Sequence, residues 1–127
     1  MSTDNNKSVK NPIVWIDCEM TGLDPEVDEL VEIAVIITDS DLNPLAEGID
    51  IVIKPSAASL AQMSPFVTQM HTDSGLINEF DSGVSLKDAE VAVLEYVSSI
   101  ISQPGVAPIA GNSIVQDVRF LRAYMPN

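Results

Sequence analysis

The stretch Ile13-Val-Trp-Ile-Asp-Cys-Glu-Met20 decides the fold of this sequence. It is an apolar run rich in β-forming residues, and it lies between Pro12 and the pair Thr21–Gly22, which interrupt regular structure. The run therefore predicts a strand that is buried on both faces. Because neighbouring side chains of a strand point to opposite faces, Asp17 and Glu19 share one face near the carboxyl end.

Three further strands follow from the same kind of pattern, at residues 30–38, 49–53 and 106–110. The link at residues 39–44 is short and rich in turn residues, which favours antiparallel pairing of the two strands that it joins. With helices between and after the later strands, the sequence predicts an α/β fold with a mixed sheet in which the first and fourth strands are parallel.

Helical spacing of apolar residues predicts a helix over residues 86–100, with Ser85 and Asp88 resembling a capping box at its start and Pro104–Gly105 ending it. A closing helix is predicted over residues 114–125, where Pro126 stops it. Residues 56–84 are predicted to be mostly loop with helical turns, including a short helix at residues 56–63.

Length and charge restrict what the chain can do. Its 127 residues suit one domain, predicted at residues 12–127 after a flexible polar arm at residues 1–11. Six Lys and Arg against 19 Asp and Glu give a net charge of −13, which excludes a broad basic track for a long nucleic acid. No apolar run approaches the length of a membrane span, and the single cysteine, Cys18, fits a reducing compartment such as the cytoplasm.

The pair Asp17 and Glu19 is the first candidate for a chemical site. Like charges this close repel each other, and no Lys or Arg lies between Lys10 and Lys54 to compensate them. A divalent cation is the simplest compensating group, and oxygen ligands favour Mg²⁺ or Mn²⁺. The alternative is that the strand end is solvated and both carboxylates extend into water.

A third acid, Asp117, is predicted on the buried side of the closing helix. Ser113 is the expected N-cap, and Asp117 shares a helix face with the apolar residues Phe120, Leu121 and Tyr124. If the first and fourth strands are neighbours, Asp117 converges on Asp17 and Glu19 to form a metal site. The alternative is a carboxylate that merely favours the positive end of the helix.

The only histidine, His71, lies in the predicted loop region, and a surface histidine without function is the default interpretation. Its distance from the acids in sequence neither supports nor excludes a role.

Several blocks of the chain together resemble the oligoribonuclease family of the DEDD superfamily of 3′-to-5′ exonucleases, which have a ribonuclease H-like fold. The likeness runs from about Ile13 to the last residues and preserves the order of the blocks. They are Trp15-Ile-Asp-Cys-Glu-Met-Thr-Gly-Leu-Asp24, Met70-His-Thr-Asp-Ser-Gly-Leu76, Ala110-Gly-Asn-Ser-Ile-Val-Gln-Asp117 and Arg119-Phe-Leu-Arg-Ala-Tyr-Met-Pro126.

The resemblance implies a function and a set of roles. Family members degrade short RNAs, ultimately dinucleotides, to mononucleotides, use two metal ions and act as homodimers. Asp17, Glu19 and Asp117 match three of the four metal-binding catalytic acids. Residues at family positions that contact the terminal nucleotides are Leu23, Phe66 (a tryptophan is common there), His71 and Ser113.

The departures from the family pattern lead to a further expectation. Family members continue well beyond residue 127, and that stretch carries the fourth acid and the general-base histidine; His71 does not match that base. Val115 and Val118 also replace residues of other types. We therefore expect an N-terminal portion of an oligoribonuclease, lacking the C-terminal elements and with little catalysis by itself. The alternatives are a short, catalytically dead relative that binds short nucleotides or a protein partner, and an acidic α/β interaction domain.

Overall fold

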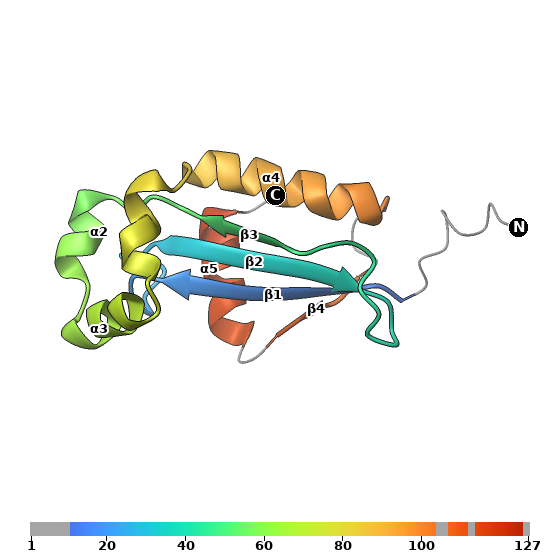
Figure 1. Cartoon of the computed structure of the whole chain (residues 1–127), viewed down its shortest axis with the longest axis horizontal. Helices are drawn as coiled ribbons and strands as arrows, with labels where there is room; N and C mark the ends of the chain where they lie inside the picture. Colours follow the sequence, from blue (N-terminus) through green and yellow to red (C-terminus); the bar gives the residue numbers. More distant parts are fainter. Residues whose placement is uncertain (1–10, 104–106, 112–113, 126–127) are drawn as a thin grey trace, which may run out of the picture.

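A four-stranded sheet in the order β3-β2-β1-β4 forms the centre of the protein in a computed structural model, which describes residues 11–103, 107–111 and 114–125 (Figure 1). The strands are β1 (Ile13–Met20), β2 (Leu30–Thr38), β3 (Ile49–Val52) and β4 (Ile109–Ala110). β1 and β3 each run antiparallel to β2, and β4 runs parallel to β1. The predicted α/β class and the mixed sheet are therefore confirmed. The predicted polar arm lies, apart from Asn11, outside the described residues.

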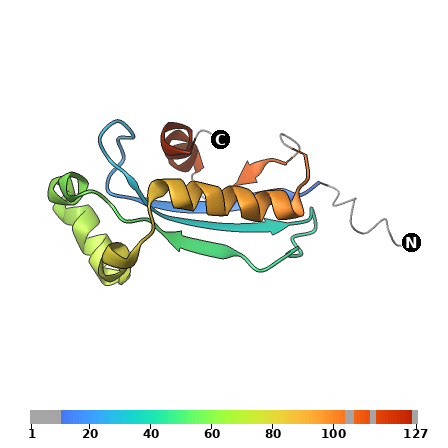
Figure 2. The same ribbon diagram turned by 90° about the horizontal axis from the view of Figure 1, so that it is seen from above.

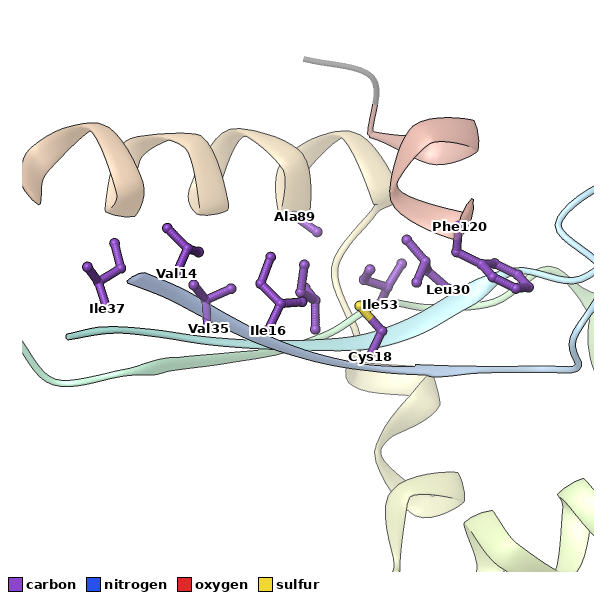
Figure 3. Close-up of a cluster of buried hydrophobic side chains, with 10 residues drawn as sticks. Val14, Ile16, Cys18, Leu30, Val35, Ile37, Ile53, Ala89 and Phe120 are labelled. Atoms are coloured by element: carbon purple, nitrogen blue, oxygen red, sulfur yellow. The ribbon is translucent and has the colours of Figure 1, made fainter. Parts of the chain in front are cut away.

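One face of the sheet carries the main hydrophobic core. Val14, Ile16 and Cys18 of β1 are buried there with apolar side chains of β2, and Figure 3 shows two helices packed over them. On the opposite face Asp17 is exposed and Glu19 half-buried. The prediction that β1 is buried on both faces is therefore wrong, because the helices that cover its core face leave the carboxylate face partly open.

The two core helices are α4 (Leu86–Ile100) and α5 (Ile114–Tyr124). α4 begins at the predicted cap, where the Ser85 side chain accepts a hydrogen bond from the Asp88 backbone N–H. It ends at Ile100, before Pro104–Gly105, which lie outside the described residues. Both helices pack apolar side chains against the core of the sheet, as predicted for α5. None of the helices in the described ranges has the length and apolar character needed to cross a membrane.

The fourth strand is shorter than predicted. β4 covers only Ile109–Ala110, and Val106 lies outside the described residues. Pro108 precedes the strand and contributes its carbonyl, which accepts a hydrogen bond from the Val14 backbone N–H (3.0 Å). Because proline has no N–H, it cannot donate to a strand ladder, and the regular pairing begins after it.

Residues 56–84 are more helical than predicted. They form α2 (Ala57–Gln62), α3 (Pro65–Asp73) and the 3₁₀ helix η1 (Leu76–Ser82). Ser64 and Pro65 start α3 instead of interrupting a helix, because the Ser64 side chain accepts from the Val67 N–H and proline fits the first helical turn. The three elements lie together at the end of the sheet where β1 ends (Figures 1 and 2).

Candidate active site

Three carboxylates from two elements come together at the carboxyl end of β1. Asp17 and Glu19 extend from the open face of β1, and Asp117 lies near the start of α5 with only 6% of its surface exposed. Their common neighbour is the buried Cys18 thiol: burial raises its pKa, and the negative charges of Asp117, Asp17 and Glu19 raise it further. The structure thus places the three predicted acids within electrostatic reach of one another.

The short β4 strand explains how a helix side chain reaches β1. β4 pairs with β1 only as far as Trp15, and Gly111 then passes against the Ile16 carbonyl. A Cβ at residue 111 would lie 2.5 Å from that oxygen, so the approach requires glycine. Among the described residues no strand pairs with β1 on this side beyond that point, and the Cys18 backbone N–H donates a hydrogen bond to the Asp117 carboxylate.

The electrostatics of Asp117 and Glu19 are unfavourable for two charged groups. Burial raises the pKa of the Asp117 carboxyl, which the Cys18 N–H lowers and the charge of Asp17 raises again. Burial likewise raises the pKa of Glu19, His71 lowers it, and Asp17 and Asp117 raise it. Oδ2 of Asp117 is buried, and no described residue forms a hydrogen bond with it. No Lys or Arg of the described ranges forms an ion pair with these acids.

The carboxylates meet some of the requirements of a divalent cation and not others. Within the described part of the chain, no three His, Cys, Asp or Glu side chains already surround one point closely enough to hold a metal ion. The donor set nevertheless fits a hard cation, because it consists of carboxylate oxygens only. The unpartnered Oδ2 of Asp117 is an acceptor that such a cation would satisfy. The three acids therefore supply suitable oxygen donors, but within the described residues they do not enclose a metal ion.

His71 is not the surface loop residue that the default interpretation predicted. It lies in α3, 1% of its surface is exposed, and its ring packs edge-on against Phe80 with 5.9 Å between ring centroids. Its Nε2 lies 2.8 Å from the Met20 carbonyl oxygen, to which it donates when protonated. The imidazole thereby ties α3 to the end of β1, next to Glu19.

The predicted substrate-contacting residues lie at the same end of the molecule. Leu23, in the loop that follows β1, and Phe66, in α3, have 66% and 77% of their surfaces exposed. Phe66 borders a shallow cavity of about 500 Å³ on α3, whose other lining residues are Gln69, Met70, Asp73 and Ser74. Ser113 lies outside the described residues.

A second cavity, of about 450 Å³, extends from Asp17 along the open face of the sheet. Asp17 and Gly111 border it at the acidic end, and Trp15, Ala34 and Ile36 line it further along. The Trp15 ring is held by a hydrogen bond from Nε1 to Thr38 Oγ1 (2.9 Å). This cavity offers an apolar surface directly next to the acids.

Sequence reasoning missed one group of residues near the site, namely Thr21, Asp28 and Tyr124. Their side chains and backbone order the loop between β1 and β2, which carries Leu23. Tyr124 and Asp28 are 96 positions apart, so no local periodicity could have revealed their contact. The only local signal was Gly22, directly before Leu23.

Comparison with solved structures shows the fold of this chain. The zinc-bound form of an E. coli exonuclease I complex with single-stranded DNA superimposes with a TM-score of 0.67 at 19% identity, over 91% of this chain and 23% of that one. E. coli exonuclease I in complex with a dT13 oligonucleotide gives a TM-score of 0.62 at 22% identity, over 91% and 23% of the two chains. The predicted ribonuclease H-like fold is thus confirmed.

Sequence comparison gives the family. The chain is 60% identical over 114 residues to an oligoribonuclease of Leifsonia xyli, covering 90% of this chain and 55% of that protein. It is 53% identical to one of Streptomyces griseus, covering 89% and 56%. The chain therefore spans about half the length of the curated relatives that it matches, and the predicted resemblance is confirmed. The RNase T family model, described as exonuclease, matches residues 14–127, so this chain belongs to the exonuclease family.

Proposed function

We propose that this chain carries catalytic carboxylates of a 3′-to-5′ exoribonuclease that hydrolyses short oligoribonucleotides, down to dinucleotides, to mononucleotides. The observation that carries the proposal is the meeting of Asp17, Glu19 and Asp117 with no ion pair to a Lys or Arg of the described ranges, and with Asp117 Oδ2 buried and not hydrogen-bonded by any described residue. Such an arrangement is costly unless a positive ion neutralises it. The similarity to proteins named oligoribonuclease supports the choice of substrate.

The three acids share one part in this proposal. Asp17, Glu19 and Asp117 would hold Mg²⁺ or Mn²⁺, two ions in the complete enzyme. When bound, such ions supply Lewis-acid activation of water and stabilise the leaving 3′ oxygen. The Cys18 N–H fixes one side of the Asp117 carboxylate. The exposed Asp17 borders the open cavity and is accessible to a substrate phosphate with its bound cation.

Substrate length follows from charge. A chain with a net charge of −13 cannot neutralise many phosphates with Lys and Arg, whereas a dinucleotide has so few that the metal ions suffice. By the family resemblance, Leu23, Phe66, His71 and Ser113 contact the terminal nucleotides. The exposure of Leu23 and Phe66 supports this for those two residues. The resemblance also supports a homodimer and a cytoplasmic location.

The chain offers a poor candidate for the general base. Its only histidine, His71, is buried with Nε2 at the Met20 carbonyl, and the described carboxylates do not yet enclose a metal ion. We therefore expect the 127-residue chain to bind metal but to cleave slowly. The same observations favour, as a second candidate, a protein that binds short nucleotides without hydrolysing them.

The test combines Mn²⁺ titration calorimetry with cleavage of a ribodinucleotide at pH 7.5. Asp17→Asn removes one carboxylate charge at the site, and Asp41→Asn is the matched control, because Asp41 is exposed in the β2–β3 turn at the opposite end of the sheet. We expect Asp17→Asn to weaken Mn²⁺ binding at least tenfold and Asp41→Asn to leave it unchanged.

The outcomes separate the candidates. Mn²⁺ binding with measurable release of mononucleotides supports the exoribonuclease, and a slower rate on the deoxyribodinucleotide supports the RNA preference. Metal-dependent ribodinucleotide binding without any release supports the binding protein. If wild-type protein takes up no Mn²⁺, or if both variants bind it equally well, the acids are surface groups and the proposal is refuted.

A further inference from the structure

The loop between β1 and β2, residues 21–29, is closed at its base. The Thr21 backbone N–H donates a hydrogen bond to the Glu29 carbonyl, and the Glu29 N–H donates one to Thr21 Oγ1; both are 2.9 Å long. Thr21 is almost completely buried. These two hydrogen bonds join the ends of β1 and β2, so that the residues between Thr21 and Glu29 form the loop.

The interior of the loop is filled by the Asp28 carboxyl group. Its Oδ2 accepts a hydrogen bond from the Asp24 N–H (3.1 Å), and its Oδ1 lies 3.5 Å from Thr21 Oγ1. A Cβ on Gly22 would lie 2.2 Å from Asp28 Oδ2, so the carboxylate occupies the space that glycine leaves. The backbone of Asp28 also donates to the Asp24 carbonyl (2.7 Å). These contacts therefore hold the loop together from inside.

A single contact links this loop to the helix that carries the third carboxylate. The Tyr124 hydroxyl donates a 2.6 Å hydrogen bond to the backbone carbonyl of Asp28. Burial and the negative charges of Glu29, Asp28 and Asp24 raise the Tyr124 pKa, which keeps the hydroxyl protonated as a donor. Asp117 lies seven residues earlier in α5, on the same helix face and about 10 Å along the axis.

The helix face between these two points is rigidly packed. Phe120 is fully buried and stacks on the Tyr124 ring, with ring centroids 6.2 Å apart and an angle of 17° between planes. One face of α5 therefore presents the Asp117 carboxylate at one end and holds the loop at the other. Leu23 projects from that loop as a largely exposed apolar side chain.

We propose that Tyr124 is a positioning residue, whose bond to the Asp28 carbonyl sets the Leu23 side chain against a nucleotide bound at the carboxylates. This rests on the proposed function, because only a nucleotide at Asp17, Glu19 and Asp117 gives Leu23 something to contact. Tyr124 itself touches no substrate; it acts through the loop and has an effect only while Leu23 is present.

The test is a double-mutant cycle measured in the full-length protein. Tyr124→Phe removes only the hydroxyl, and Tyr96→Phe is the matched control, because the buried Tyr96 hydroxyl on α4 has no partner within the described structure. Affinity for a phosphorothioate-linked ribodinucleotide, which resists hydrolysis, is measured by calorimetry with Mn²⁺. Amide hydrogen exchange reports the order of residues 21–29.

We expect Tyr124→Phe to weaken ribodinucleotide binding by about 3- to 10-fold, the range for loss of one hydrogen bond. Exchange of the Asp24, Val27 and Asp28 amides should rise by a similar factor, whereas Tyr96→Phe changes neither quantity. In a Leu23→Ala background, Tyr124→Phe should have no further effect on affinity, since Leu23 transmits it.

Equal losses from Tyr124→Phe with and without Leu23 overturn the inference, because Tyr124 then acts elsewhere. Unchanged exchange in the loop also overturns it. Wild-type protein that binds no ribodinucleotide refutes the proposed function, and this inference with it. If the wild-type protein binds the ribodinucleotide but the effects of Tyr124→Phe and Leu23→Ala on affinity are additive, only this inference is refuted.

Discussion

Replacing Asp117 by Asn should stabilise the metal-free protein while removing its response to metal. The substitution keeps the shape of the side chain and an oxygen that can accept the Cys18 N–H bond. It removes the negative charge that burial and Asp17 disfavour, and it replaces one carboxylate oxygen by an amide group that can donate to the neighbouring acids. The raised pKa of Asp117 leads to the same expectation, because the metal-free fold loses stability as pH rises through that pKa and the carboxylate becomes charged.

The magnitude follows from the contacts of the two oxygens. A buried oxygen without a partner, such as Asp117 Oδ2, costs roughly 1–3 kcal/mol, and the substitution relieves this cost. Against this, the bond from Cys18 becomes weaker by about 1 kcal/mol because its acceptor is no longer charged. The net gain is about 1 kcal/mol, which corresponds to a rise in Tm of roughly 4 °C for a domain of this size.

The assay is thermal unfolding at pH 7.5, first with EDTA and then with MnCl₂ at about one hundred times the wild-type Kd. Binding at that concentration stabilises the wild-type protein by about 2.7 kcal/mol, whereas the variant gains little. The order of the two melting temperatures should therefore reverse between the two buffers. Asp41→Asn, an exposed acid in the β2–β3 turn, should follow the wild type in both.

Two results would refute this reasoning. If Asp117→Asn lowers Tm in EDTA, the carboxylate is satisfied in the folded protein and its unpartnered oxygen is of no consequence. If MnCl₂ raises the Tm of the variant as much as that of the wild type, Asp117 is not a ligand.

Two further predictions concern the sheet and its edge. Burial, a hydrogen bond with Asp50 and the charges of nearby acids raise the pKa of Glu32 from 4.5 to about 8. The metal-free fold should therefore lose stability as pH rises from about 4.5 to 8. Urea unfolding at a series of pH values should show a flatter dependence of stability on pH in Glu32→Gln and the wild-type dependence in Glu47→Gln. Gly111→Ala places a Cβ 2.5 Å from the Ile16 carbonyl oxygen and should lower the free energy of unfolding in urea by about 1–3 kcal/mol. Mn²⁺ binding should also weaken, because the start of α5 is displaced. Wild-type values for both quantities would contradict the close approach.

Much of the sheet could be predicted because alternation and apolar runs are local signals. The bounds of β1 and β2, the antiparallel pairing through the turn at residues 39–44, and the parallel pairing of β4 with β1 all agree with the structure. The burial of Asp117 could likewise be predicted, since it shares a helical stripe with Phe120. These features depend on side-chain periods of two and 3.6 residues, which a sequence shows directly.

The helical segment at residues 65–82 could not be predicted from the same signals. Its apolar residues are few, and α3 is only weakly amphipathic, so periodicity gives little guidance there. The pair Ser64–Pro65 has two meanings, a break or a helix start, and only packing at the end of the sheet decides between them. The burial of His71 follows from that packing, which explains why a surface position was expected.

The loop contacts were beyond prediction for another reason. The Tyr124 bond ends on a backbone carbonyl, so the chemical identity of the residue at position 28 carries no information about it. The Cys18 bond to Asp117 has the same property on the donor side. Contacts between a side chain and a distant main chain depend on how the elements are arranged in space, and they become visible only when the fold is known.

The two-residue length of β4 has a consequence for how such a centre can change. A longer strand would continue its main-chain hydrogen bonds along β1. Here the Asp117 side chain of α5 accepts from the Cys18 N–H instead. A neighbouring main chain and the Asp117 carboxylate thus compete for the Cys18 N–H. An insertion that prolonged the strand past Ala110 would pair its main chain with the Cys18 N–H and displace the Asp117 carboxylate. A longer β1–β4 ladder and the present position of this carboxylate therefore exclude each other.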